Sequence, residues 1–126
     1  MRTVIIGGVA GGASAAARLR RLREKDEIIL IDRGDYISFA NCGLPYYIGG
    51  EIKEKHMLTL QTPESFRARF NVDVRIKNEV VKIEPDEHRI TVKKLDTGEA
   101  YDLCFDRLIL SPGAEPLKPS IEGVNL

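Results

Sequence analysis

The sequence lacks the features of several large protein classes. No apolar stretch approaches the roughly 20 residues that span a bilayer. At the N-terminus, Gly7, Gly8, Gly11 and Gly12 interrupt the apolar run that a signal peptide would need. There is no excess of charge of either sign, because 19 basic residues balance 19 acidic ones. This balance argues against nucleic-acid binding. We therefore predict no membrane association, no nucleic-acid partner and a cytoplasmic location.

Cysteine is also scarce. The chain contains only Cys42 and Cys104, and they form no CxxC pair. Two cysteines in a chain that is 43% hydrophobic do not indicate a disulfide scaffold. We predict no metal site. The length of 126 residues and the apolar content indicate a single folded domain rather than disorder.

The first third of the chain has a regular pattern. An apolar run at residues 2–6 predicts a buried strand, and the residues at 11–24 are good helix formers, with Ala15, Leu19 and Leu22 on one face. A second continuous apolar run follows at residues 28–31. A strand, a helix and a strand within about 30 residues indicate a parallel βαβ unit.

The remainder predicts further elements of both kinds. Thr62 resembles an N-cap for a helix over residues 63–69, and residues 72–76 suggest a third parallel strand. From residue 79 the hydrophobic period becomes two, with turn signals at 85–87 and 96–98, which predicts a three-stranded antiparallel meander. Residues 107–110 form one more apolar strand. We predict an α/β, Rossmann-like fold with a parallel sheet plus a three-stranded antiparallel β-meander.

A glycine turn, residues 7–12, separates the first strand from the first helix. It matches G-x-G-x-x-G except that Val9 replaces the middle glycine. Asp32 ends the second strand, where a carboxylate can accept hydrogen bonds from ribose hydroxyls. The turn opens a helix, whose free N–H groups favour a pyrophosphate. The alternative is a tight strand–helix turn that binds no ligand.

A second motif is the cysteine loop, residues 38–47. We expect Cys42 to lie at the start of a short helix, where the thiolate is favoured. The alternative for a single cysteine is a buried structural thiol, and we expect Cys104 to be a small apolar residue of the meander. On the first helix, Ser14, Arg18 and Arg21 share one face, where the two arginines could bind phosphates. The alternative for that face is a solvated basic surface.

Together these motifs make the chain similar to a known family. It resembles the N-terminal FAD-binding segment of the pyridine nucleotide-disulfide oxidoreductases. Within that family it resembles the single-cysteine coenzyme A-disulfide reductases and coenzyme A persulfide reductases. The similarity rests on residues 7–22, 38–47 and 106–116. It implies that residues 1–116 are an incomplete FAD-binding domain and that residues 117–126 are a linker or a truncated tail.

The resemblance implies roles for individual residues. The pyrophosphate of FAD would lie against the glycine turn, the adenosine ribose against Asp32 and the adenine against the backbone of Val80. The full set of implied cofactor-binding residues is Gly7, Gly8, Val9, Ala10, Gly11, Gly12, Asp32, Arg33, Val80, Ser111, Pro112 and Gly113. Cys42 would face the flavin and form a mixed disulfide or persulfide with coenzyme A. The coenzyme A moiety would contact Ser14, Arg18, Arg21, Ser38 and Asn41.

The activity implied is FAD-dependent, NAD(P)H-driven reduction of coenzyme A disulfide or persulfide through Cys42. NADH or NADPH would bind a domain absent from this chain. We therefore expect the chain alone to be inactive, and the parent protein to be a homodimer. Two alternatives stay open: an NADH oxidase or peroxidase that cycles Cys42 through sulfenic acid, and an FAD-binding module without turnover of its own. Ala10 replaces a histidine of the oxidase and peroxidase relatives, which favours thiol substrates.

Overall fold

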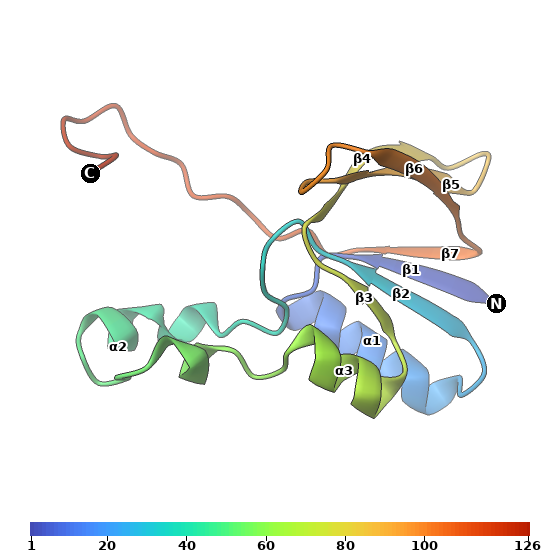
Figure 1. Cartoon of the computed structure of the whole chain (residues 1–126), viewed down its shortest axis with the longest axis horizontal. Coiled ribbons are helices and arrows are strands. Elements are labelled where there is room, and N and C mark those ends of the chain that lie inside the picture. Colours follow the sequence, from blue (N-terminus) through green and yellow to red (C-terminus); the bar gives the residue numbers. More distant parts are fainter.

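Seven strands form two separate sheets in the computed structural model, which describes residues 1–126. The larger sheet is parallel, with the order β3-β2-β1-β7, and the smaller one is antiparallel, with the order β4-β5-β6 (Figure 1). The parallel strands are β1 (Arg2–Ile6), β2 (Glu27–Ile31), β3 (Asp73–Arg75) and β7 (Arg107–Leu110). The meander consists of β4 (Asn78–Glu84), β5 (Arg89–Lys94) and β6 (Ala100–Cys104). The predicted fold class is confirmed.

The parallel sheet is covered on both faces. Helices α1 (Ala10–Leu22) and α3 (Pro63–Phe70) lie against one face, and the meander lies over the other (Figure 1). Alternate residues of each central strand therefore enter different cores: Ile5 contacts the helices, whereas Val4 faces the meander. Burial of both faces explains why the apolar residues at 4–6 of β1 and at 28–31 of β2 follow one another without polar alternation.

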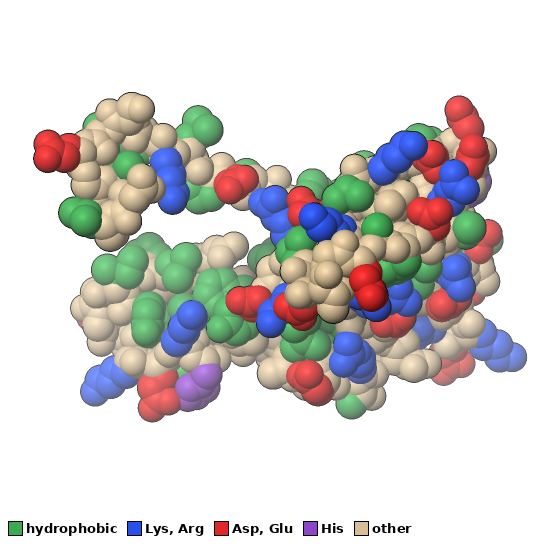
Figure 2. All heavy atoms as spheres, turned by 45° about the horizontal axis from the view of Figure 1, so that its top comes forward, with side chains coloured by type: hydrophobic (Ala, Val, Ile, Leu, Met, Phe, Trp, Pro, Cys, Tyr) green, Lys and Arg blue, Asp and Glu red, His purple; other side chains and the backbone are tan.

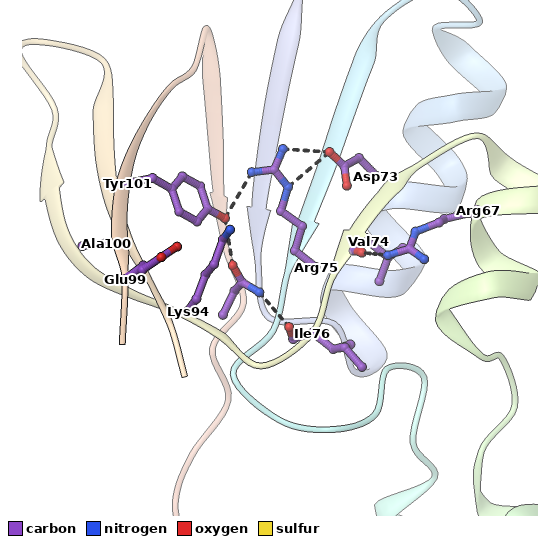
Figure 3. A pocket seen from close by; sticks show the side chains of 10 residues that line it. Arg67, Asp73, Val74, Arg75, Ile76, Lys94, Glu99, Ala100 and Tyr101 are labelled. Atoms are coloured by element: carbon purple, nitrogen blue, oxygen red, sulfur yellow. Dashed lines mark hydrogen bonds and ion pairs between the residues drawn. The ribbon is translucent and has the colours of Figure 1, made fainter. Parts of the chain in front are cut away.

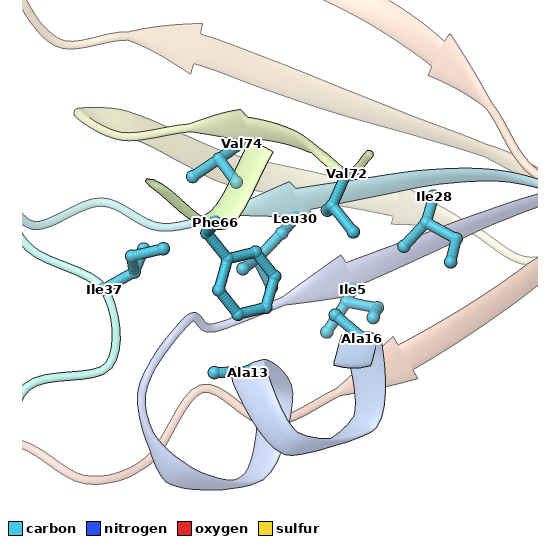
Figure 4. Close-up of a cluster of buried hydrophobic side chains, with 9 residues drawn as sticks. All are labelled: Ile5, Ala13, Ala16, Ile28, Leu30, Ile37, Phe66, Val72 and Val74. Carbon is cyan, nitrogen blue, oxygen red and sulfur yellow. The ribbon is translucent and has the colours of Figure 1, made fainter. Parts of the chain in front are cut away.

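Small residues bring α1 close to the sheet. Its buried positions are Gly12, Ala13 and Ala16, and the two alanines pack against strand side chains and Phe66 of α3 (Figure 4). The predicted apolar face was wrong at Leu22, which is 62% exposed. Ala15 and Leu19 of the same predicted face are partly buried and pack against the core, whereas Leu22 is the last residue of α1 and lies in solvent.

The helix predicted after Thr62 is confirmed with its cap. The Thr62 hydroxyl oxygen accepts the Ser65 N–H at 3.0 Å, and the Thr62 N–H donates to the Ser65 hydroxyl oxygen at 2.9 Å. This reciprocal capping satisfies two backbone donors that helix geometry leaves free. The helix ends at Phe70, and its C-cap Asn71 adopts a left-handed conformation with φ of 50°. The chain then enters β3, which pairs with β2 in parallel as predicted.

The segment between β2 and α3 projects from the sheet. It contains a 3-10 turn at Asn41–Gly43, the short helix α2 (Leu44–Ile48) and a second 3-10 turn at Lys55–Leu58. Apolar side chains gather on the surface of this segment (Figure 2), among them those of Leu44, Tyr46, Tyr47 and Ile48. After β7 the chain forms no further helix or strand, and its tail extends away from the sheet (Figure 1). None of the helices has the length and the apolar character of a membrane-spanning segment.

Candidate functional site

Close backbone contacts explain the glycines of the glycine turn. Gly7 has a φ of 100°, and a Cβ at this position would lie 1.9 Å from the carbonyl oxygen of Ser111. A Cβ at Gly12 would lie 1.6 Å from the carbonyl oxygen of Gly7. No side chain fits at either position. Glycine at these two positions lets the backbone of residues 7–12 pack directly against the start of α1 and against the segment after β7.

The turn leads directly into the N-terminus of α1. The helix begins at Ala10, has no side-chain cap and carries no acidic residue in its first turn. Helix geometry leaves the N–H groups of this first turn without intrahelical acceptors, and the helix dipole makes this end positive. The backbone here is thus suited to an anion, and no side chain of α1 competes for its donors.

A pocket of about 420 Å³ opens beside the turn at the carboxyl ends of the parallel strands. We call it the turn pocket. Its lining includes seven of the predicted cofactor-binding residues, namely Gly7, Val9, Asp32, Arg33, Val80, Pro112 and Gly113. The other five predicted positions, Gly8, Ala10, Gly11, Gly12 and Ser111, do not line it. They include the glycines that let the backbone around the pocket pack closely.

The turn pocket also has lining residues that the sequence analysis missed. They are Ile6, Ile31, Gly34, Asn78, Glu79, Ala114 and Glu115. At its rim, Arg33 pairs with Glu115 at 3.7 Å, but both side chains are more than half exposed. An exposed pair of this kind contributes at most about 1 kcal/mol. Asn78 and Glu79 line the pocket because β4 begins beside the end of β2, where the Asn78 N–H donates to the carbonyl oxygen of Asp32 at 3.1 Å. No local sequence pattern indicates that these two segments are neighbours.

Asp32 has a structural role within the chain, because both of its carboxylate oxygens accept backbone N–H groups. One carboxylate oxygen accepts the N–H of Gly8 at 2.7 Å, and the other accepts the N–H of Gly34 at 2.8 Å. The side chain therefore fixes the glycine turn to the segment after β2. Each carboxylate oxygen keeps further acceptor capacity, so the predicted contact with a ribose hydroxyl is compatible with this arrangement.

Cys42 is a free, exposed thiol. It lies in the 3-10 turn Asn41–Gly43, immediately before α2. A Cβ on the next residue, Gly43, would lie 2.6 Å from a methyl group of buried Leu58, so the turn sits tightly on the second 3-10 segment. Within this chain, therefore, Cys42 is not a buried structural thiol. Cys104 is exposed as well, because its neighbour Leu103 takes the inward position of β6.

The cysteine loop is anchored to the glycine turn through its first residue. The Ser38 N–H donates to the carbonyl oxygen of Gly8 at 2.7 Å. Ser38 also adopts a left-handed conformation, with φ of 51°, which turns the chain toward Cys42. The two predicted sites, one glycine-rich and one carrying the thiol, are therefore joined directly through the backbone.

The arginines of α1 fall into two groups. Arg18 and Arg21 are exposed, as is Ser14, and none of these three side chains has a hydrogen bond or ion pair within the chain. Arg20 instead donates to four backbone carbonyl oxygens, those of Phe70, Asn71, Arg23 and Glu24, at 2.8 to 2.9 Å. Arg20 thus caps the ends of α1 and α3, while Arg18 and Arg21 are available to a ligand.

A second pocket, of about 480 Å³, lies between β3 and the meander (Figure 3). Four of its polar side chains hydrogen-bond to one another. The Arg75 guanidinium donates to Asp73 at 2.8 Å and to the Tyr101 hydroxyl at 3.1 Å, and that hydroxyl donates to Asn78 at 2.9 Å. The hydrogen bond to Asp73 raises the pKa of Arg75. We interpret this network as a structural junction between the two sheets.

The comparisons with known proteins agree with this architecture. Residues 1–126 match the family described as pyridine nucleotide-disulphide oxidoreductase. The chain therefore belongs to the pyridine nucleotide-disulphide oxidoreductase family. Coenzyme A disulfide reductase of Staphylococcus epidermidis is 39% identical over 113 residues, which are 90% of this chain and 26% of that protein. The chain thus spans about a quarter of the length of this relative.

Solved structures give the same relationship. The reduced CoADR-RHD of Bacillus anthracis is 60% identical, with a TM-score of 0.93 over 98% of this chain and 22% of that one. The NAD-dependent persulfide reductase from A. fulgidus is 34% identical, with a TM-score of 0.91 over 99% of this chain and 23% of that one. The predicted family resemblance is confirmed.

Proposed function

We propose that this chain supplies the FAD-binding and thiol-bearing part of an NAD(P)H-driven reductase of coenzyme A disulfide or persulfide. The observation that carries the proposal is the exposed Cys42 thiol on a loop hydrogen-bonded to the glycine turn. The names of the relatives support it, since they include a coenzyme A disulfide reductase and a persulfide reductase.

The residues present fit a dinucleotide. The close contacts at Gly7 and Gly12 leave no room for a Cβ. The backbone of the glycine turn therefore lies next to the N-terminus of α1 with no side chain at these two positions, an arrangement suited to phosphate groups. Asp32 lies in the turn pocket with acceptor capacity for ribose hydroxyls, and Val80, the residue proposed to meet the adenine, lines the same pocket. When bound, FAD would accept a hydride from the nicotinamide and return two electrons to a disulfide.

The chain's own part in the chemistry is thiol–disulfide exchange. The Cys42 thiolate attacks one sulfur of the disulfide, the substrate S–S bond breaks, one coenzyme A thiolate leaves, and a mixed disulfide joins Cys42 to the other half. Exposure of Cys42 gives a large substrate access to the sulfur. The unpaired Arg18 and Arg21 would bind coenzyme A phosphates, assisted by Ser14 on the same helix and by Ser38 and Asn41 on the cysteine loop.

The remaining parts of the proposal concern the longer protein. The nicotinamide cofactor would bind outside these residues, so we predict that the 126-residue chain has no turnover by itself. A homodimer and a cytoplasmic location also stay predictions. The exposed apolar side chains around α2 are consistent with a surface that an assembled protein covers. The boundary at residue 116 stays a prediction as well.

The test is a pair of cysteine substitutions in a full-length protein that carries this chain. Cys42→Ser should lower NAD(P)H-dependent reduction of coenzyme A disulfide by about 10³-fold or more while FAD stays bound, because serine cannot form the mixed disulfide. Cys104→Ser, which alters the other exposed thiol, should keep turnover within about twofold. Turnover that survives Cys42→Ser would refute the role of this thiol.

The NADH oxidase or peroxidase alternative is tested with the same preparation. NADH consumption is compared with oxygen, peroxide or coenzyme A disulfide as the oxidant. Ala10 brings no imidazole to the start of α1, so peroxide cleavage at Cys42 has no proton donor from this position. We expect coenzyme A disulfide to be the preferred oxidant, and faster consumption with peroxide would favour the alternative.

A further inference from the structure

Gly8 joins two functional segments through its own backbone. Its N–H donates to a carboxylate oxygen of Asp32 at 2.7 Å, and its carbonyl oxygen accepts the N–H of Ser38 at 2.7 Å. The second oxygen of Asp32 accepts the N–H of Gly34 at 2.8 Å. A continuous chain of hydrogen bonds thus runs from the end of β2, through the glycine turn, to the first residue of the cysteine loop.

Packing around this chain leaves little freedom. A Cβ at Gly8 would lie 2.7 Å from a methyl group of Ile37 and 3.3 Å from the carboxylate of Asp32. Ile37 is fully buried and precedes Ser38 directly. The position of Gly8 therefore determines where the cysteine loop leaves the core.

The other side of the loop is held by the segment before α3. The Leu60 N–H donates to the Ser38 carbonyl oxygen at 3.1 Å, and the Ala40 N–H donates to the Leu58 carbonyl oxygen at 2.7 Å. Cys42 follows Ala40 by two residues. The loop is thus clamped between the glycine turn and residues 58–60, and loss of one side would leave it held from the other side only.

We propose that Asp32 is a positioning residue for Cys42, in addition to any contact it makes with a cofactor. The inference rests on the proposed function in that Cys42 is the reacting thiol. The carboxylate is needed because both of its oxygens accept N–H groups. An asparagine has one acceptor oxygen and one NH₂ donor, so Asp32→Asn places a donor against either Gly8 or Gly34. The glycine turn then loses its hydrogen bond to the residue that follows β2, and the carbonyl oxygen of Gly8, which accepts the Ser38 N–H, is no longer held in place.

The test uses the 126-residue chain with Cys104→Ser, so that Cys42 is the only thiol. Amide hydrogen exchange is measured at Ser38, and at Leu103 in the meander as an internal reference. Asp32→Asn should speed exchange at Ser38 by about tenfold or more, with Leu103 within about twofold. Asp35→Asn is the matched control, because Asp35 is exposed, makes no hydrogen bond and loses the same charge.

A second readout concerns the thiol. The reaction of Cys42 with coenzyme A disulfide, which forms the mixed disulfide of Cys42 with coenzyme A, should slow by about threefold or more in Asp32→Asn. The reason is that the large substrate must contact Cys42 and α1 at the same time. Alkylation by iodoacetamide, a small uncharged reagent, should change by less than about twofold, since Cys42 stays exposed. If Asp32→Asn fails to fold, Asp32→Glu, which keeps both oxygens but displaces them by one methylene, should show the same pattern more weakly.

Unchanged exchange at Ser38, or equal effects of Asp32→Asn and Asp35→Asn, would overturn the inference. Equal slowing with iodoacetamide and with coenzyme A disulfide would also overturn it, because it would indicate a change in the intrinsic reactivity of the thiol rather than in its position. Failure of the proposed function looks different. In that case Cys42 of the unsubstituted chain does not react with coenzyme A disulfide, while exchange at Ser38 still responds to Asp32.

Discussion

Replacement of Gly12 by alanine should destabilise the protein, although the same change inside an ordinary helix stabilises it by about 0.5–1 kcal/mol. The added Cβ would lie 1.6 Å from the carbonyl oxygen of Gly7 and 3.3 Å from a methyl group of Ile5. The first contact is with backbone, and Ile5 is fully buried, so neither neighbour can rotate away. The start of α1 must therefore retreat from β1 by more than 1 Å, a distance that close-packed cores do not absorb.

The magnitude follows from overpacking. Inserted methyl groups in well-packed cores cost about 1–3 kcal/mol, and a clash with backbone lies at the upper end. We expect Gly12→Ala to lower the free energy of unfolding by about 2–3 kcal/mol after the gain in helix propensity. The assay is urea unfolding followed by far-UV circular dichroism, with the slope of the transition checked for constancy.

Gly11→Ala is the matched control one residue earlier. Its Cβ would lie 2.5 Å from the hydroxyl oxygen of Ser111, which can rotate away, and 3.7 Å from the next nearest atom. We expect a change within about 1 kcal/mol, which becomes a gain when Ser111→Ala is added. Equal losses for Gly11→Ala and Gly12→Ala, or a Gly12→Ala protein as stable as the original, would refute the packing argument.

Three further predictions concern stability. Arg20→Met should lower the free energy of unfolding by about 2 kcal/mol in thermal denaturation, because four carbonyl oxygens lose their donor, whereas Arg23→Met should change it by less than about 0.5 kcal/mol. The hydrogen bond from Lys82 lowers the pKa of Glu84 from 4.5. The ionised Glu84 therefore stabilises the folded state above pH 4.5, and this contribution is lost as pH falls through the lowered pKa. Glu84→Gln should therefore flatten the decline of stability below that pH. Tyr101→Phe should lower the free energy of unfolding by about 1 kcal/mol, since the hydroxyl bridges a guanidinium and an amide oxygen between the sheets.

The elements that sequence reasoning predicted are those with local signals. The apolar runs of β1 and β2, the cap at Thr62 and the period of two in the meander each lie within a few residues of the structure they specify. The glycine turn was predictable for the same reason, because a strand, four glycines and a helix follow one another directly. The position of Asp32 beside the glycine turn was predictable from its place at the end of the second strand.

The residues that sequence reasoning missed depend on contacts between distant segments. Arg20 and Arg21 are neighbours with the same side chain, and only the arrival of Phe70 and Asn71 beside α1 gives them different roles. The dual contact of Asp32 with Gly8 and Gly34 likewise requires the glycine turn and the end of β2 to be adjacent. No periodicity in the sequence encodes these pairings, because they arise from sheet order and helix packing.

The charges of the turn pocket determine how a dinucleotide could lie in it. The pocket contains the carboxylates of Asp32, Glu79 and Glu115 against the single guanidinium of Arg33, so its field disfavours an anion. Sugar and base are uncharged, and carboxylates can accept from their hydroxyl and amino groups. The first turn of α1 has no acidic residue and a positive dipole end. The phosphates are therefore expected at α1, with the nucleoside in the turn pocket. The rest of the ligand would then continue from the glycine turn, to which the loop that carries Cys42 is hydrogen-bonded.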